Sequence, residues 1–131
     1  RRAGQAAPVG ARADRGGAGE RAAERHMVRR GWTVLARRWR GAGGELDLVL
    51  ARGRVVAMCE VKTRADPRAL DEPLTAAQRA RIDRAARAYV AAHPELAGRR
   101  LRVDLITVHA GRLRARVRHH AGYAADLKER R

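Results

Sequence analysis

The chain has 131 residues, with 30 Lys and Arg against 14 Asp and Glu, and a formal net charge of +16. This length suits one compact domain and is short for two. The charge favours a polyanionic partner, with nucleic acid ahead of an anionic membrane surface. The one cysteine cannot form an intramolecular disulfide, and no apolar run approaches the ~20 residues of a membrane span.

The two ends of the chain differ in composition from the middle. Residues 1–17 lack periodicity and predict a disordered basic arm, for which a solvated tail is favoured over a specific nucleic-acid contact. Residues 18–124 are expected to form a single domain, and residues 125–131 a basic tail. No secretory signal is visible, so we expect a cytoplasmic protein that does not enter the membrane.

The first half of the domain predicts a helix followed by three strands. The helix spans residues 18–30, and its apolar face comprises Ala22, Ala23, Met27 and, less well placed, Val28. Strands are expected over residues 32–39, 45–51 and 55–63. The glycine-rich turns between them are short, which favours an antiparallel meander.

The second half predicts a helix over residues 76–92 and strands over 101–108 and 113–118. Thr75 and Gln78 have the spacing of a capping box. The apolar stripe of the helix consists of Ile82, Ala85, Ala86, Tyr89 and Val90. Because this helix crosses over between the third and fourth strands, those strands are expected to be parallel. The predicted fold is α/β, a mixed sheet of about five strands flanked by helices.

Charged residues interrupt two of the predicted strands at Asp47, Glu60 and Lys62. A charge in a strand core costs several kcal/mol unless it is paired or bound to a metal. Glu60 and Lys62 share a face, and a simple hairpin register brings Asp47 toward them. The carboxylates, with the Val61 carbonyl, form the hard-oxygen set that Mg²⁺ prefers. In a chain of charge +16, this set indicates metal-assisted phosphodiester hydrolysis.

Lys62 is one of only two lysines, the other being Lys128, in a chain whose remaining cations are arginines. Its position therefore indicates that a compact ammonium group is needed there. Spacing leaves an ordinary alternative open: Glu60 and Lys62 could be an exposed ion pair on an edge strand. Asp47 could then be a buried carboxylate satisfied near Arg64.

Other chemistry-bearing residues have simpler interpretations. Trp32 and Trp39 are seven residues apart on one predicted strand and fall on opposite faces, so one is expected in the core and the other at its rim. His119 and His120 are adjacent and point apart, which argues against a metal pair. Cys59 is expected to pack as a small apolar side chain.

Several of these segments together resemble the YraN-type family of small bacterial proteins. The likeness rests on Gly19-Glu20 opening a helix, Gly31-Trp32 with Val34-Leu35 and Arg40, residues 44–49 and 60–64, Asp104 and His119. It covers roughly residues 18–124, most of the domain.

The resemblance implies the PD-(D/E)xK nuclease superfamily, whose restriction-endonuclease-like core runs helix, three-strand meander, helix, strand. Asp47 and Glu60 would then be ligands of Mg²⁺ or Mn²⁺, and Lys62 the catalytic lysine. Glu20 is similar to an additional acid that archaeal Holliday-junction resolvases carry on the first helix. Its alternative is an acid stabilised by the helix macrodipole. Glu45 would be an auxiliary acid or an ion-pair partner.

The chain departs from this family pattern in two places. Residues 69–73 replace a Phe-Gly that usually precedes a proline, and Gln78 stands where the second helix usually offers a lysine. The capping box is the favoured explanation of Gln78. The expected function is a metal-dependent nuclease acting on DNA, including branched or structured DNA, for which a homodimer would suit two strands. The alternatives are a non-catalytic nucleic-acid-binding protein and a structural partner in a repair or recombination complex.

Overall fold

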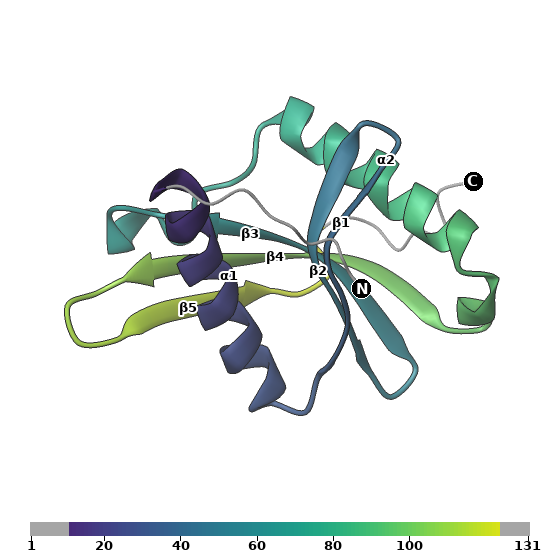
Figure 1. The fold of residues 1–131 in the computed structure, drawn as a ribbon, viewed down its shortest axis with the longest axis horizontal. Coiled ribbons are helices and arrows are strands. Elements are labelled where there is room, and N and C mark those ends of the chain that lie inside the picture. Colours follow the sequence, from purple (N-terminus) through teal and green to yellow (C-terminus); the bar gives the residue numbers. More distant parts are fainter. Residues whose placement is uncertain (1–10, 124–131) are drawn as a thin grey trace.

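The computed structural model describes residues 11–123, with side chains from residue 17 onward. Its helices and strands, in chain order, are α1 (Ala11–Val28), β1 (Thr33–Gly41), β2 (Gly44–Arg52), β3 (Val55–Thr63), α2 (Ala76–Ala92), β4 (Arg100–Ala110) and β5 (Ala115–His120) (Figure 1). This order confirms the predicted α/β fold class, which is that of a restriction-endonuclease-like core. Neither helix of the described region combines the length and apolarity needed to cross a membrane.

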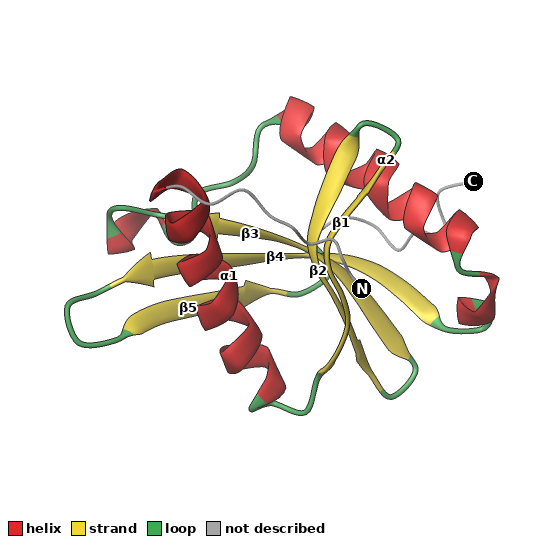
Figure 2. Ribbon diagram, viewed as in Figure 1, coloured by secondary structure: helices red, strands yellow, loops and turns green. Residues whose placement is uncertain are grey.

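The strands form one five-stranded sheet in the order β1-β2-β3-β4-β5. Neighbours are antiparallel except for the central pair β3 and β4, which are parallel as expected. The parallel pair requires a crossover connection, and α2 supplies it. Helix α1 packs on one face of the sheet and α2 on the other (Figure 2).

Each face of the sheet therefore has its own apolar cluster. The cluster under α2 includes Leu46, Val49, Val56, Met58, Leu74, Ile82, Ala85, Ala86, Tyr89, Leu96, Leu101, Val103 and Leu105. The cluster under α1 includes Ala22, Ala23, Met27, Trp32, Leu48, Leu50, Ala57, Cys59, Ile106 and Val108. Burial of apolar surface on both faces explains why the central strands read as nearly continuous apolar runs.

Helix α1 starts seven residues earlier than predicted and ends at Val28, two residues before the predicted end. It begins at Ala11, so residues 11–17 of the predicted arm are helical; the alanines there are strong helix formers. Residues 1–10 and the predicted tail, 125–131, lie outside the described residues. Val28 was expected on the buried face but is 47 % exposed. It follows the buried Met27 by one residue, which turns its side chain about 100° away.

The two tryptophans lie on opposite faces of the sheet, as predicted. Trp32 is 4 % exposed in the α1 cluster, although it precedes β1 instead of opening it. Trp39 is partly buried against the α2 cluster, with its ring edge-on to Tyr89 at 5.2 Å between centroids. Because the rings are on different faces, they do not form a joint platform for stacking bases.

Candidate active site

The site begins where β2 and β3 stop pairing. Their register runs from the turn as far as Leu48 opposite Cys59. Beyond that pair the strands diverge, and β3 continues beside β4 (Figure 1). Asp47 is the next residue on β2 and Glu60 the next on β3. The Asp47 side chain replaces the backbone pairing, because its Oδ2 accepts a 2.7 Å hydrogen bond from the Val61 N–H.

The alternation of side chains along β2 breaks at the same place. Leu46 packs in the α2 cluster, whereas Leu48 packs in the α1 cluster. Residues two apart on a regular strand would share a face. The irregular backbone around Asp47 therefore lets its carboxylate enter the gap between the strands, although it is only 8 % exposed.

Glu60 and Lys62 complete the predicted set. The Lys62 Nζ lies 3.2 Å from Glu60 Oε2, and their side chains are 28 % and 16 % exposed. Strand β3 is central, so this is not the exposed edge-strand pair that the sequence left open. Arg64 does not satisfy Asp47 as its alternative required, since its guanidinium contacts the carboxylate and the carbonyl of Glu72.

Burial raises the pKa of both carboxyl groups. Burial, followed by the negative charge of Glu60, raises the pKa of Asp47 to about 8, against the hydrogen bond from Val61. Burial also raises the pKa of Glu60, and the nearby Lys62 ammonium partly offsets it. Two carboxyls in one site do not readily ionise together. A cation between them would remove this conflict.

Glu20, on α1, is a further acid of this group. Its negative charge acts on Asp47, and its Oε1 accepts a 2.8 Å hydrogen bond from Arg38 Nε. The charge of Arg38 also acts on Glu45 and Asp47, so an arginine faces the acidic group. Arg38 has a φ of 51°, which is uncommon for a non-glycine residue and is found more often at functional sites.

Arg38 is a site residue that sequence reasoning missed. The left-handed backbone that aims its side chain at Glu20 has no signature in the residue pattern. The one available signal was the pair Arg37-Arg38, which interrupts the alternation along β1 with two successive exposed residues.

Gly19 sets the distance between α1 and the end of β3. A Cβ at this position would lie 2.4 Å from Thr63 Oγ1, well inside contact distance. Glycine therefore leaves room for the Thr63 hydroxyl in its present orientation, directly beside the residue that precedes Glu20.

The oxygens that could hold a divalent cation come from Asp47, Glu60 and Val61. The N–H and C=O of one strand residue face the same neighbour, so the Val61 carbonyl shares the gap that its N–H faces. Within residues 17–123, no three or more His, Cys, Asp or Glu side chains form a metal-holding group. Mg²⁺ needs only one or two carboxylates, because water and substrate phosphates complete its shell. The donor set fits such an ion.

The family of the chain follows from its sequence matches. Residues 19–108 match the model of the uncharacterised protein family UPF0102. The chain belongs to this family. The UPF0102 match includes Glu20, Asp47, Glu60 and Lys62, so the whole predicted acid and lysine set lies inside the family region.

Relatives in several bacteria carry the name UPF0102 protein. The one from Methylorubrum extorquens is 48 % identical over 82 residues, 63 % of this chain and 64 % of the relative. One from Methylobacterium nodulans is 45 % identical over 94 residues, 72 % of this chain and 73 % of the relative. One from Roseiflexus castenholzii is 39 % identical over 105 residues, 79 % of this chain and 85 % of the relative.

Gln78 and the two C-terminal histidines have structural roles in this UPF0102 fold. The Gln78 side chain accepts from the Thr75 N–H, and the Thr75 hydroxyl accepts from the Gln78 N–H, which confirms the capping box. His119 and His120 have different partners: His119 bonds Asp104 at 2.7 Å, and His120 lies 3.1 Å from the Leu70 carbonyl. They do not form a metal pair.

Asp104 is buried and fully engaged. Its oxygens bond Arg102 through two contacts, His119, and the Gly122 N–H. Burial alone would raise its pKa, but these hydrogen bonds together hold it below its usual value. A carboxylate with this many donors fastens β4, β5 and the following turn together, and is not free to bind a ligand.

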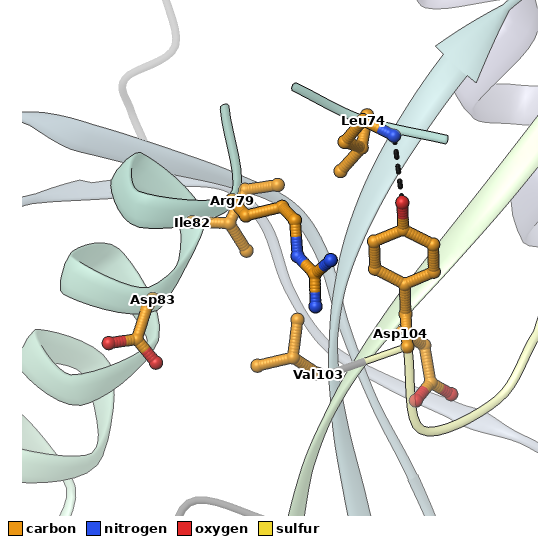
Figure 3. A pocket seen from close by; sticks show the side chains of 7 residues that line it. Leu74, Arg79, Ile82, Asp83, Val103 and Asp104 are labelled. Atoms are coloured by element: carbon orange, nitrogen blue, oxygen red, sulfur yellow. Dashed lines mark hydrogen bonds between the residues drawn. The ribbon is translucent and has the colours of Figure 1, made fainter. Parts of the chain in front are cut away.

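A small pocket beside α2 is separate from the acidic site. It is lined by Leu74, Arg79, Ile82, Asp83, Val103, Asp104 and Tyr123 (Figure 3). The Leu74 N–H donates to the Tyr123 hydroxyl at 2.7 Å, and the Arg79 guanidinium lies over the Tyr123 ring. The free space inside is about 10 Å³, enough for one water molecule at most. A nucleotide does not fit there.

Proposed function

We propose that this UPF0102 protein is a nuclease that hydrolyses phosphodiester bonds in DNA with Mg²⁺ or Mn²⁺. The observation that carries the proposal is the meeting of Asp47, Glu60 and Lys62 where β2 and β3 part. Two carboxylates and an ammonium group in one partly sheltered place can serve phosphoryl chemistry. The net charge of +16 supports a polyanionic substrate, and the family resemblance supports branched or structured DNA.

Each group of the proposed site would have a separate role in hydrolysis. When bound, the cation would neutralise charge on the scissile phosphate and lower the pKa of a water molecule. Asp47 and Glu60 would hold it with side-chain oxygens, and Val61 with its carbonyl. Lys62 is oriented by Glu60, and its three N–H donors can position a water molecule or bond a phosphate oxygen.

Glu20 and Arg38 would support this site from α1 and β1. Glu20 fixes the Arg38 guanidinium close to the carboxylates, where it can meet a phosphate group. We propose Glu20 as the additional acid of the site on this ground. A symmetric homodimer would present one site to each strand of a duplex.

The test is cleavage of labelled single-stranded, duplex and four-way-junction DNA with Mg²⁺, Mn²⁺ or EDTA. Asp47→Asn and Glu60→Gln should lower the rate by at least about a hundredfold, because the cation supplies several kcal/mol of charge stabilisation. Glu95→Gln, an exposed acid at the other end of the sheet, is the matched control and should cleave like the wild type.

The outcomes separate the candidate functions. Cleavage that survives in Asp47→Asn and Glu60→Gln would reject the site, because neither ligand would be needed. Binding of DNA without cleavage under both metals would favour a non-catalytic nucleic-acid-binding protein instead.

A further inference from the structure

The β4–β5 hairpin ends in a fully exposed leucine. Leu113 is 98 % exposed, whereas Leu35 and Val28, the other exposed large apolar residues of the described chain, are 43 % and 47 % exposed. It lies in the turn between Ala110 and Ala115, which pair with one another. The Gly111 N–H donates to the Arg114 carbonyl at 3.1 Å and closes this turn. The geometry therefore holds the leucine side chain away from the protein.

Arginines surround this leucine. Arg112 and Arg114 flank it directly, Arg116 follows on β5, and all three are exposed. No ion pair within the described part of the chain engages these three guanidinium groups, whereas Arg118 further along β5 contacts Asp71 at 2.5 Å. The hairpin tip thus combines one apolar side chain with positive charge that no acid of residues 17–123 neutralises.

The tip lies at the same end of the sheet as the acidic site. In the parallel pair of β3 and β4, Lys62 is opposite Thr107 and Thr63 is opposite Val108. Strand β4 continues past the end of β3, and the hairpin extends beyond it at the left of Figure 1. Gly111 is four residues beyond Thr107, so at about 3.3 Å per residue the turn stands ~13 Å past Lys62. Nucleic acid over the acidic site can reach that distance.

We propose that Arg112, Leu113 and Arg114 form a nucleic-acid wedge. Leu113 enters a base step or an unpaired position, and the two arginines hold the flanking phosphates. Apolar side chains inserted in this way unstack a step and kink the duplex, at a cost that falls where the bases are already unstacked. The inference rests on the proposed function for its substrate class and adds a preference for distorted DNA.

Charge complementarity favours nucleic acid over a protein as the partner of the hairpin tip. A lone exposed apolar residue carries no meaning by itself. Here the residue projects from a turn between arginines that pair with no acid of the described region. A docked protein would therefore need a matching acidic rim around a single apolar pocket. A phosphate backbone supplies negative charge on both sides of every base step.

The experiment measures binding in EDTA, so that cleavage plays no part. Fluorescence anisotropy compares a continuous duplex with the same duplex carrying one bulged base, and 2-aminopurine beside the bulge reports unstacking. The wild type should bind the bulged duplex about tenfold more tightly, because unstacking that step is already paid for. Leu113→Ala should lose this preference and the rise in 2-aminopurine fluorescence. Leu35→Ala, a half-exposed leucine at the other end of the sheet, should keep both.

The arginines are tested by the salt dependence of binding. The double variant Arg112→Gln/Arg114→Gln should weaken binding to both duplexes by the same factor. It should also reduce the slope of log K against log salt by about 2, since two phosphate contacts are lost. Arg25→Gln/Arg29→Gln removes the same charge from exposed positions in the last turn of α1 and just after it, and should change the slope much less.

The results have distinct consequences. If Leu113→Ala and Leu35→Ala behave alike on both duplexes, the wedge is rejected. A Leu113→Ala protein that changes its mass in light scattering and not its DNA binding also rejects it, and indicates a protein interface. If cleavage depends on Asp47 but Leu113→Ala binds both duplexes like the wild type, the nuclease proposal stands and the wedge is rejected. If Leu113→Ala loses the preference for the bulged duplex but no DNA is ever cleaved, the wedge stands and the nuclease proposal is rejected.

Discussion

Asp47 is held in a position that favours its neutral form until a cation is present. Its carboxylate is buried beside Glu60, and burial with that neighbour's charge raises its pKa to about 8. One stabilising contact, the Val61 N–H, works against this shift. The residue therefore lowers the stability of the metal-free protein whenever it is ionised.

This gives a pH dependence with a definite sign. The unfolded carboxyl loses its proton near pH 4, while the folded one keeps it until about pH 8. Between those values the folded state binds the extra proton, so raising the pH favours unfolding. In EDTA we expect the wild type to lose a few kcal/mol of stability from about pH 5 to pH 8. Asp47→Asn should lose clearly less, as measured by urea unfolding.

Glu95→Gln serves as the control, because its carboxylate is exposed. It should follow the wild-type pH dependence. A wild type whose stability is flat across this interval would contradict the raised pKa and mean that Asp47 is ionised in the free protein.

At the level of elements, α2 and the start of β2 approach so closely that a glycine is required. A Cβ at Gly44 would lie 2.6 Å from the Arg81 backbone oxygen and 3.2 Å from Ala85 Cβ. A helix carbonyl cannot move as the end of a long side chain can. Gly44 thus fixes the height of α2 over the strand that carries Asp47.

Gly44→Ala should therefore destabilise the protein by about 1–3 kcal/mol, as overpacking of a close contact does. Thermal and urea unfolding measure it. Gly17→Ala is the matched control, since its Cβ would meet only the ends of Arg21 and Arg38 side chains. That substitution should be neutral or stabilising, because alanine favours a helix by about 1 kcal/mol over glycine. Equal effects of the two would contradict the close packing.

The hydrogen bonds of Asp104 join β4, β5 and the turn after β5. Asp104 is fully buried and its partner Arg102 is half-buried, with side chains 0 % and 18 % exposed. Asp104→Ala leaves Arg102 without its carboxylate and should cost about 3–5 kcal/mol, measured by urea unfolding. Asp71→Ala breaks an exposed pair with Arg118 and should leave the midpoint nearly unchanged. A small effect at Asp104 would mean that water replaces its contacts.

For the whole molecule, the charge of +16 predicts that the proposed binding to nucleic acid depends strongly on salt. If six to ten phosphates are contacted, the slope of log K against log salt should lie between about −5 and −9. Titrations of duplex DNA at increasing KCl concentrations measure it. A slope near zero would contradict an electrostatic interface and with it the substrate class proposed above.

The architecture could be predicted because its signals are local. The turns at residues 41–44 and 52–54 bracket apolar runs, and β2 and β3 lie within a residue of their predicted bounds. The capping residues Thr75 and Gln78 placed the start of α2 for the same reason. The intervening helix then implied the parallel pairing of β3 with β4.

Parts of the site could not be predicted, since they depend on contacts between distant residues. Arg38 meets Glu20 across 18 positions only because its backbone turns left-handed. The Asp47 bond to the Val61 N–H exists only because β2 leaves β3 at that point. The periodicity of apolar residues describes regular strands, so it identified the candidate residues. It could not predict the irregular backbone that brings them together.

The hydrogen bond from the Val61 N–H to Asp47 makes one backbone amide a spectroscopic probe of the acidic site. An amide that donates to an ionised carboxylate is more strongly polarised than one that donates to a neutral acid. In a protein labelled with ¹⁵N-valine, the Val61 resonance should therefore shift as Asp47 gains or loses its proton, or binds an ion. The interrupted strand pairing thus offers a signal that can be followed without any substrate.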